Sequence, residues 1–343
     1  MNDNGKAGST TLKEVAAALG VSTMTVSRAI NNKPNVDPKT RKKILEVASQ
    51  MGYTPNHVAK SLVSSRTFTI GVVIPEISHS FFPEVVRGIQ EESNKKNYQI
   101  FLTNTSDDFT NEQQIINALR SKRVDGLLIS SSLGDADYSY YEQIIKAGPP
   151  VVFFDRCISG IGASCIGIND FQASRLITNH LINNGYKRVA YLSGPRVVSI
   201  GKDRYDGFLS ALNDNGLTIF ENLIIESGYN EKGGYHAMKK LLELPVELRP
   251  DAVVAVNDPV AFGAMDAIIN AGLSIPDDIA IVGFTDDIRA PLVHSPLTTI
   301  HQPAYEVGKQ AVMKLINAIE NRREPIEHIL LPTEIVIRKS CGS

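Results

Sequence analysis

The amino-acid sequence predicts an α/β protein with two parts: a small all-α helix-turn-helix headpiece and a larger, doubly wound body with parallel sheets. Two observations support this fold class. Residues 1–66 hold three short helical patterns and an excess of basic side chains. From about residue 68, short apolar runs alternate with helical patterns, as in parallel sheets covered by helices. About 275 residues are long for one such sheet and comfortable for two subdomains.

A tight turn joins the first two helical patterns. Gly20 ends the first, because glycine accepts the left-handed conformation at a helix end, and Ser22 can cap the second. Each pattern has one apolar face: Leu12, Val15, Ala16 and Leu19, then Val26, Ala29 and Ile30. The outward positions of the second helix are Thr23, Met24, Ser27 and Arg28. Such a helix fits the major groove of B-DNA, so we expect a sequence-specific DNA-binding motif rather than an ordinary helical hairpin.

A third helical pattern completes the headpiece. Asp37 can cap it, Pro38 suits its first position, and Gly52 ends it. Its apolar stripe is Ile44, Val47, Ala48 and Met51. We therefore place the headpiece at residues 10–54.

Residues 55–67 are expected to form a hinge helix and linker. Val58, Ala59, Leu62 and Val63 give this segment one apolar face, but it is too short to be a stable helix alone. A plain linker is the alternative. We expect the segment to fold when it packs against a paired copy and a DNA minor groove, with Leu62 as a wedge between base pairs.

The charge distribution agrees with this division. Residues 1–66 hold ten Lys or Arg and four Asp or Glu, a net charge of +6. Since the whole chain carries −2, the remainder carries −8. A basic head on an acidic body favours attraction of the head to DNA phosphates.

The headpiece motifs point to a known family. They are Thr-Leu-x-x-Val-Ala from Thr11, Gly-Val-Ser from Gly20, Thr-Val-Ser-Arg from Thr25, Thr40-Arg41, and Gly52-Tyr53-x-Pro55-Asn56-x-x-Ala59-x-x-Leu62. This pattern resembles the lactose-repressor/galactose-repressor family of bacterial transcription regulators.

The resemblance implies a division of labour on DNA. Thr23, Met24 and Arg28 would contact bases, the first two favouring thymine methyls and Arg28 suiting guanine. Other residues would position the protein on the DNA through contacts with backbone phosphates: Ser22, Thr25, Ser27, Asn31, Thr40, Tyr53 and Asn56. Thr11, Leu12 and Ala59 complete the expected DNA-contacting set, with Leu62 as the minor-groove lever.

The body alternates predicted strands and helices. The strands are 70–75, 99–105, 126–130, 150–155, 188–194, 252–258 and 279–284. The helices are roughly 81–96, 110–121, 138–147, 171–184, 202–215, 231–243, 258–271 and 303–320. Polar residues follow most strands, and ligands of open parallel sheets bind outside the carboxyl ends of strands. Two such subdomains facing each other would form a ligand cleft.

The resemblance extends along the body, which in that family is similar to periplasmic sugar-binding proteins. It implies three crossings between subdomains, near 162–168, 288–298 and 323–330. Within a body at 68–340, we expect an N-terminal subdomain at about 68–163 plus 298–323. The C-terminal subdomain would then be about 164–297 plus 324–340.

By position, the resemblance also implies the residues that bind an effector: Phe81, Phe82, Asp155, Arg204, Asn257, Thr285 and Asp286. One of Phe81 and Phe82 is expected in the hydrophobic core instead. The family usually has Asp after Gly-Phe, whereas here Thr285 precedes Asp286, so that carboxylate is missing or displaced by one residue. We expect a small-molecule effector, a sugar or sugar derivative, with a phosphorylated or non-sugar ligand left open.

Other functional classes find little support. The sequence has no phosphate-binding loop, no H-E-x-x-H and no G-x-S-x-G, and its seven His lack metal-ligand spacing. We therefore expect neither an enzyme nor a cofactor. Three cysteines without C-x-x-C predict reduced thiols in the cytoplasm, and no apolar run approaches the length of a membrane span.

The expected partners are operator DNA, the effector and a second copy of the chain in a homodimer. A regulator controlled mainly by a protein that binds the body is the alternative.

Overall fold

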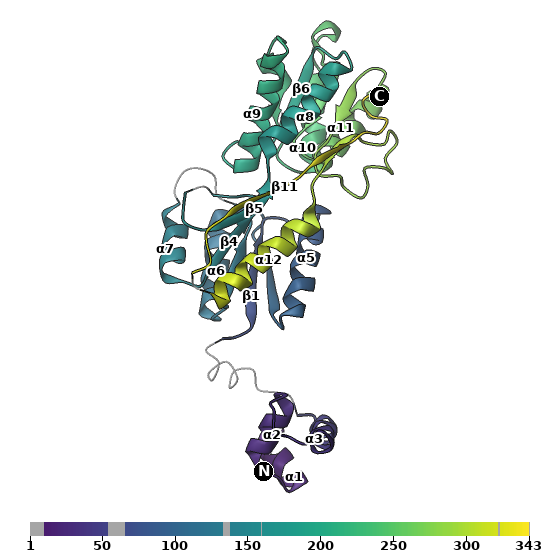
Figure 1. Ribbon diagram of the computed structural model, residues 1–343. Coiled ribbons are helices and arrows are strands. Elements are labelled where there is room, and N and C mark those ends of the chain that lie inside the picture. Colours follow the sequence, from purple (N-terminus) through teal and green to yellow (C-terminus); the bar gives the residue numbers. More distant parts are fainter. Residues whose placement is uncertain (1–9, 54–65, 133–137, 159, 322, 343) are drawn as a thin grey trace, which may run out of the picture. The chain divides into compact units, whose positions relative to one another are not determined.

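The computed structural model describes residues 10–53, 66–132, 138–158, 160–321 and 323–342 (Figure 1). The chain divides into two compact units, Met1–Thr67 and Phe68–Ser343, and each is described by itself. Three residues predicted to contact DNA, Asn56, Ala59 and Leu62, lie outside the described residues, as does the rest of 54–65.

The headpiece contains α1 (Leu12–Leu19), α2 (Thr23–Ile30) and α3 (Pro38–Gln50). Gly20 takes the left-handed conformation at the end of α1, with φ 65°, as the sequence predicts. Ser22 and Asp37 cap α2 and α3 through their side chains. The core consists of Val15, Ala16, Val26, Ala29, Ile44 and Ala48, with Leu12, Leu19, Ile30, Met51 and Tyr53 packed around it.

The first sheet of the body has the strand order β11-β5-β4-β3-β1-β2, with every neighbouring pair parallel. Its strands are β1 (Thr69–Ile74), β2 (Gln99–Asn104), β3 (Gly126–Ile129), β4 (Val151–Phe154), β5 (Ser164–Ile168) and β11 (His328–Leu331). The helices α5 (Phe81–Lys95) and α12 (Ala304–Glu320) cover one face. The other face packs against α6 (Phe109–Ser121) and α7 (Ser139–Ala147).

The second sheet has the parallel order β7-β6-β8-β9. Its strands are β6 (Val189–Ser193), β7 (Ile224–Glu226), β8 (Ala252–Ala255) and β9 (Ala280–Val282). The helices α8 (Asp170–Asn183) and α9 (Ser199–Asp214) cover one face. The other face packs against α10 (Glu231–Leu242) and α11 (Asp258–Asn270), and Figure 1 shows these two layered subdomains.

Two strands lie outside both sheets, and short turns of 3₁₀ helix complete the second subdomain. The pair β10 (Thr299–His301) and β12 (Glu334–Val336) is antiparallel and occurs where the chain passes between subdomains. The 3₁₀ turns are Glu221–Leu223 and Val246–Leu248.

The sheet pairing moves the expected subdomain boundaries. We expected the N-terminal subdomain to stop at about 163 and residues from 324 onward to be C-terminal, but β5 and β11 both pair within the first sheet. The predicted boundaries would cut that sheet. We therefore propose that the chain crosses after Ile168, between His301 and Ala304, and after Leu331.

Two glycines let α5 and α12 approach closely on the first sheet. A Cβ atom at Gly308 would overlap the carbonyl oxygen of Val85, and one at Gly88 would overlap that of Tyr305. In both cases the obstacle is backbone, which cannot move aside as a flexible side chain can.

We therefore expect Gly308→Ala to lower the free energy of unfolding of the body by about 2–3 kcal/mol, the cost of overpacking a tight interface. Urea unfolding measures this loss. Asn317→Ala, at an exposed position of α12, is the control and is expected to change stability by about 0.5 kcal/mol or less. Equal effects of the two variants would show that the helices separate without cost.

Candidate functional site

The outward face of α2 carries the side chains predicted to read DNA bases. Thr23, Met24 and Arg28 are exposed, and Met24 is 64% exposed although it is apolar. The Arg28 guanidinium makes no hydrogen bond or ion pair with the described residues of the headpiece. Its donors are therefore available to a ligand.

Several residues in and next to α2 that are predicted to contact phosphates also stabilise the ends of this helix. Ser22 Oγ accepts the N–H of Thr25 at 3.1 Å and lies 2.9 Å from the Thr25 hydroxyl. Asn31 Nδ2 donates to the carbonyl of Ser27 at 2.8 Å. These contacts fix both ends of α2, so the same side chains can only reach a phosphate with their remaining donor or acceptor sites.

Thr11, Thr40 and Tyr53, which are also predicted to contact DNA, likewise take part in the structure of the headpiece. Thr11 forms a capping box with Glu14, in which the Thr11 N–H donates to Glu14 Oε2 at 2.7 Å. Thr40 donates to Asp37 from its N–H at 3.0 Å and from its hydroxyl at 3.3 Å. Tyr53 is half-buried against the headpiece core.

A cavity of about 270 Å³ lies in the body between the carboxyl ends of the two sheets. Loops after β1, β2 and β4 line it from the first subdomain, and loops after β6, β7, β8 and β9 from the second. This is where open parallel sheets bind ligands. We call it the cleft. It is lined by these predicted residues: Phe81, Phe82, Asp155, Arg204, Asn257 and Thr285.

The two phenylalanines have different surroundings. Phe82 is 7% exposed and belongs to the core between α5, α12 and the first sheet. Phe81 is half-buried, and its ring meets that of Phe82 edge to face at 5.2 Å. One of the pair is therefore core, as expected, and Phe81 is the ring that can face a ligand.

Arg204 is a buried member of the cleft. Its Nε donates to Asp170 Oδ1 at 2.7 Å, and it also donates to the carbonyl of Val256 at 2.7 Å. The guanidinium stacks on the Phe284 ring, 3.7 Å from the ring centre. Since Arg204 and Asp170 are 3% and 7% exposed, this ion pair is shielded from water on nearly all sides.

A second arginine, Arg156, follows β4 and was missed as a site residue. It is 4% exposed, it forms an ion pair with Asp107 after β2, and it lies over the ring of Tyr229 at 5.0 Å. Tyr229 belongs to the second subdomain, so Arg156 contacts both walls of the cleft. The Arg156 Nε and the Tyr229 hydroxyl are buried and have no partner within the described chain.

Asp155 contributes a carboxylate to the cleft. No hydrogen bond to its side chain occurs among the described residues, and its backbone is left-handed with φ 58°. Burial raises the pKa of Asp155 to about 6, although the nearby guanidinium groups of Arg156 and Arg204 oppose the rise. Burial also raises the pKa of Tyr229 to about 12, so its hydroxyl keeps its proton at neutral pH.

The turn after β9 separates two neighbouring carboxylates. Asp286 does not line the cleft, contrary to expectation, because it accepts from Arg338 at 2.7 Å and lies 3.1 Å from His301 Nδ1. Asp287 lines the cleft instead. Thr285 and Asp286 both have positive φ, 138° and 61°, and this bend turns the two side chains in different directions.

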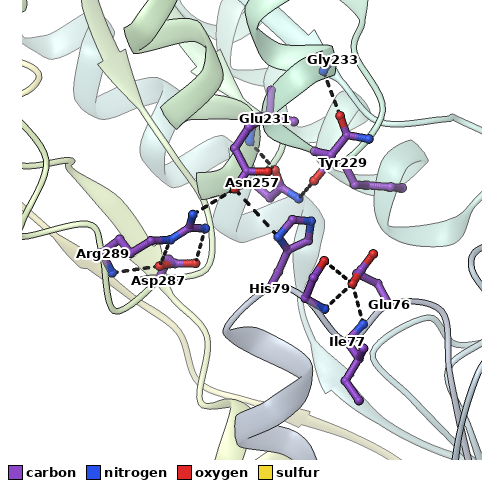
Figure 2. A network of polar contacts seen from close by, with 12 residues as sticks. Glu76, Ile77, His79, Tyr229, Glu231, Gly233, Asn257, Asp287 and Arg289 are labelled. Atoms are coloured by element: carbon purple, nitrogen blue, oxygen red, sulfur yellow. Dashed lines mark hydrogen bonds and ion pairs between the residues drawn. The ribbon is translucent and has the colours of Figure 1, made fainter.

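Asn257 has a structural role at the cleft wall. Its Oδ1 caps α11 by accepting the N–H of Val260 at 2.9 Å, and its Nδ2 donates to the carbonyl of Tyr229 at 2.9 Å. Asn257 therefore holds the loop that carries Tyr229 (Figure 2). A ligand can reach only its second amide hydrogen and its remaining lone pair.

A polar network joins the two subdomains at the rim of the cleft (Figure 2). His79 Nδ1, after β1, lies 4.0 Å from Glu231 Oε1 at the start of α10. Arg289 donates to the same Glu231 oxygen at 3.0 Å and to Asp287 at 2.9 Å. A ligand that changes the distance between the subdomains must therefore change the His79–Glu231 contact.

Glu76 stabilises the loop that carries His79. It accepts from the Ile77 N–H at 2.6 Å and from the Ser78 hydroxyl at 2.5 Å. Burial favours a higher pKa for Glu76, but these hydrogen bonds outweigh it and lower the pKa. The carboxylate therefore stays ionised and keeps the loop in place.

The prediction of reduced thiols is wrong for two of the three cysteines. Cys157 and Cys165 form a disulfide, because the loop between β4 and β5 brings their Cα atoms to 5.9 Å. Cys341 is buried, and its thiol lies 3.2 Å from His180 Nε2. Within the described chain, no helix is both long and apolar enough to cross a membrane.

Two family models match the chain. "Bacterial regulatory proteins, lacI family" matches residues 11–56, and "Periplasmic binding proteins and sugar binding domain of LacI family" matches residues 67–339. The chain is 33% identical over 331 residues to Catabolite control protein A of Priestia megaterium, covering 96% of this chain and 98% of that protein. It is also 33% identical over 332 residues to the transcriptional repressor PurR of Mannheimia succiniciproducens, covering 96% and 98%.

Solved structures agree. A lac repressor dimer bound to operator and the anti-inducer ONPF has a TM-score of 0.87 at 25% identity, covering 98% of this chain and all of that one. The transcriptional regulator CelR in complex with cellobiose has a TM-score of 0.74 at 28% identity, covering 96% and 99%. These relatives are transcription regulators, not enzymes.

Proposed function

This chain belongs to the LacI family of bacterial regulatory proteins, and we propose that it is a repressor whose homodimer binds a near-palindromic operator under the control of a sugar. As a member, it is a DNA-binding transcription regulator controlled by a small-molecule effector. We propose which residues contact each ligand, that the effector is a sugar, and that the protein acts in the bacterial cytoplasm.

The proposed base contacts come from the exposed face of α2. Arg28 has a guanidinium without a partner in the described headpiece, and its fork matches the O6 and N7 acceptors of guanine. Met24 and Thr23 offer apolar contact to thymine methyls. The caps at Ser22 and Asp37 keep the helices in the orientation that these contacts require.

The proposed effector site is the cleft. The observation that carries this proposal is the Asp155 carboxylate, which has no partner in the described chain and lies in the same cavity as Phe81 and Tyr229. A carboxylate can accept hydrogen bonds from sugar hydroxyls while an aromatic ring packs against the apolar side of the sugar. The cellobiose complex of CelR, a relative, supports a sugar as the class of ligand.

Control of DNA binding is proposed to pass through the angle between the subdomains. A ligand between Asp155 on one side and Tyr229 on the other alters the distance across which His79 and Glu231 meet. The hinge segments of the two copies are then brought together or moved apart. Coupling of this kind typically amounts to about 1–3 kcal/mol.

Thermal unfolding in the presence of a panel of neutral mono- and disaccharides tests the site. A sugar that binds the folded cleft raises the melting temperature, and Asp155→Ala is expected to abolish the rise. If no small molecule of the panel changes the melting temperature, the proposed sugar control fails, and control by a partner protein becomes the better account.

We also expect the affinity for the sugar to depend on pH. Asp155 accepts hydrogen bonds best when ionised, and burial raises its pKa to about 6. Affinity is therefore full above this pKa and falls as the pH drops through it, by up to about tenfold at pH 5. Calorimetric titration from pH 5 to 8 measures the change. Asp155→Asn, which does not titrate, is expected to bind weakly and equally over this range, and a wild-type profile as flat as that of the variant would exclude Asp155 as the acceptor.

A further inference from the structure

The charges of the cleft restrict the sugar it can take. We propose that the cleft binds uncharged or positively charged sugars and excludes phosphorylated and carboxylated ones. This inference rests on the proposed sugar site and specifies the class of ligand within it.

The arginines that an anion would need are already paired. Arg204 is held by Asp170 at 2.7 Å, by the Val256 carbonyl and by the face of Phe284. Arg204 keeps N–H groups on Nη1 and Nη2 for a ligand, but Asp170 already balances its charge. A phosphate bonded to those groups would be buried without a net positive charge to balance it, so Arg204 is a poor receptor for phosphate.

Arg156 is paired in the same manner. Its guanidinium bonds to Asp107 through Nη1 and, at 3.5 Å, through Nη2, and one of its faces is covered by Tyr229. Only Nε is left without a partner in the described chain. A single buried N–H suits one oxygen of a neutral hydroxyl, whereas a phosphate needs several donors and a net positive charge.

Arg289 at the rim is also neutralised. It bonds to Asp287 at 2.9 and 3.0 Å and to Glu231 at 3.0 Å, so two carboxylates face one guanidinium. Each arginine described in the cleft and at its rim, Arg156, Arg204 and Arg289, thus has an acidic partner.

The cleft carries more negative than positive side chains. Its lining includes the carboxylates of Glu76, Asp107, Asp155 and Asp287 against the guanidinium groups of Arg156 and Arg204. Asp155 has no cationic hydrogen-bond partner, and it shares the cavity with the place where a ligand would lie. A phosphate beside it would bring together two negative charges in a region of low dielectric constant.

Acidic side chains lie in the first turns of three helices that begin at the cleft. Glu84 and Glu231 offset the positive ends of the α5 and α10 dipoles. Burial raises the pKa of Asp258, in the first turn of α11, to about 7, so near neutral pH its charge offsets the dipole of α11 only in part. The start of α9 presents Ile200 to the cavity, an apolar side chain that suits a sugar ring.

Neutral hydroxyls satisfy what the cleft leaves open. Asp155 needs donors, the Arg156 Nε needs an acceptor, and the buried Tyr229 hydroxyl can use either. A hydroxyl group both donates and accepts, so adjacent hydroxyls of a sugar can serve all three groups. A sugar amine would, in addition, place a positive charge near Asp155.

The test compares matched ligands that differ in charge: neutral aldohexoses and disaccharides, their phosphate esters, their uronic acids and their 2-amino derivatives. Affinities are measured by calorimetry on the full-length protein at pH 7.5. We expect phosphates and uronates to bind at least about tenfold more weakly than their neutral parents, and amino sugars to bind as well or better.

The Asp155→Asn variant reports on the cause. It is expected to reduce the preference for neutral over phosphorylated sugar at least about fivefold, because it removes the repulsive charge while keeping the shape. Asp214→Asn is the control, since Asp214 is exposed on α9 and pairs with Arg175 at 2.9 Å. That control is expected to leave the preference unchanged.

The two proposals fail in different ways. A phosphorylated sugar that binds more tightly than its neutral parent would overturn charge selection and leave the sugar site standing. Binding of no panel member, whatever its charge, would overturn the sugar site itself and this inference with it.

Discussion

Asp170→Ala is expected to lower the free energy of unfolding of the body by about 3–5 kcal/mol, because it leaves a buried arginine without its counter-charge. Arg204 and Asp170 are 3% and 7% exposed, and their bond links α9 to the start of α8. The remaining partners of Arg204, the Val256 carbonyl and the Phe284 ring, carry no full charge. Urea unfolding of the full chain measures the loss.

The same two helices provide a matched control. Arg175 of α8 pairs with Asp214 of α9 at 2.9 Å, but their side chains are 40% and 48% exposed. Water screens this pair, so Asp214→Ala is expected to cost less than about 1 kcal/mol. If Asp170→Ala and Asp214→Ala destabilise the body equally, the buried pair does not organise the cleft as we describe.

Arg28→Ala is expected to weaken binding to the specific operator by about 5- to 150-fold, the range for loss of one bidentate base contact. Binding to unrelated duplex DNA is expected to fall by less than about threefold, because phosphate contacts elsewhere in the basic headpiece carry it. Titrations of labelled operator and of random duplex at the same salt concentration measure both values.

The conservative variant separates charge from shape. Arg28→Lys keeps the positive charge but loses the planar fork, so it is expected to lose operator affinity while binding random duplex as the wild type does. An equal loss on both duplexes in Arg28→Ala would instead make Arg28 a phosphate contact.

Local chemistry in the sequence predicts much of the fold. Gly20, Ser22 and Asp37 mark helix ends because their conformations and capping groups act within a few residues. The long helices of the body follow from apolar spacing in the same way, and α11 begins beside Asn257, which caps it.

Elements that depend on distant partners could not be predicted. The strand β5 is the short run Ser-Cys-Ile-Gly-Ile, and it pairs with β11, far along the chain. The strand β7 is only three residues long. Neither gives a strong local signal, because short strands gain stability from the sheet they join.

The cleft shows a similar limit. The family resemblance pointed to Asp155 and Arg204, which both line the cleft, but not to Arg156, whose contacts with Asp107 and Tyr229 come from other loops. The sequence signal that could have pointed to Arg156 is its position next to Asp155 at the end of a predicted strand. The choice between Asp286 and Asp287 depends on the positive φ values of the turn, which the sequence does not display.

We propose that this chain recognises one particular DNA duplex as a dimer. Selection of bound DNA from a random duplex pool by the purified protein tests this recognition. We predict enrichment of one near-palindromic sequence with two half-sites, bound at least about a thousandfold more tightly than competitor DNA. Recovery of a pool with no enriched sequence, or of a single half-site bound by one copy, would contradict the account.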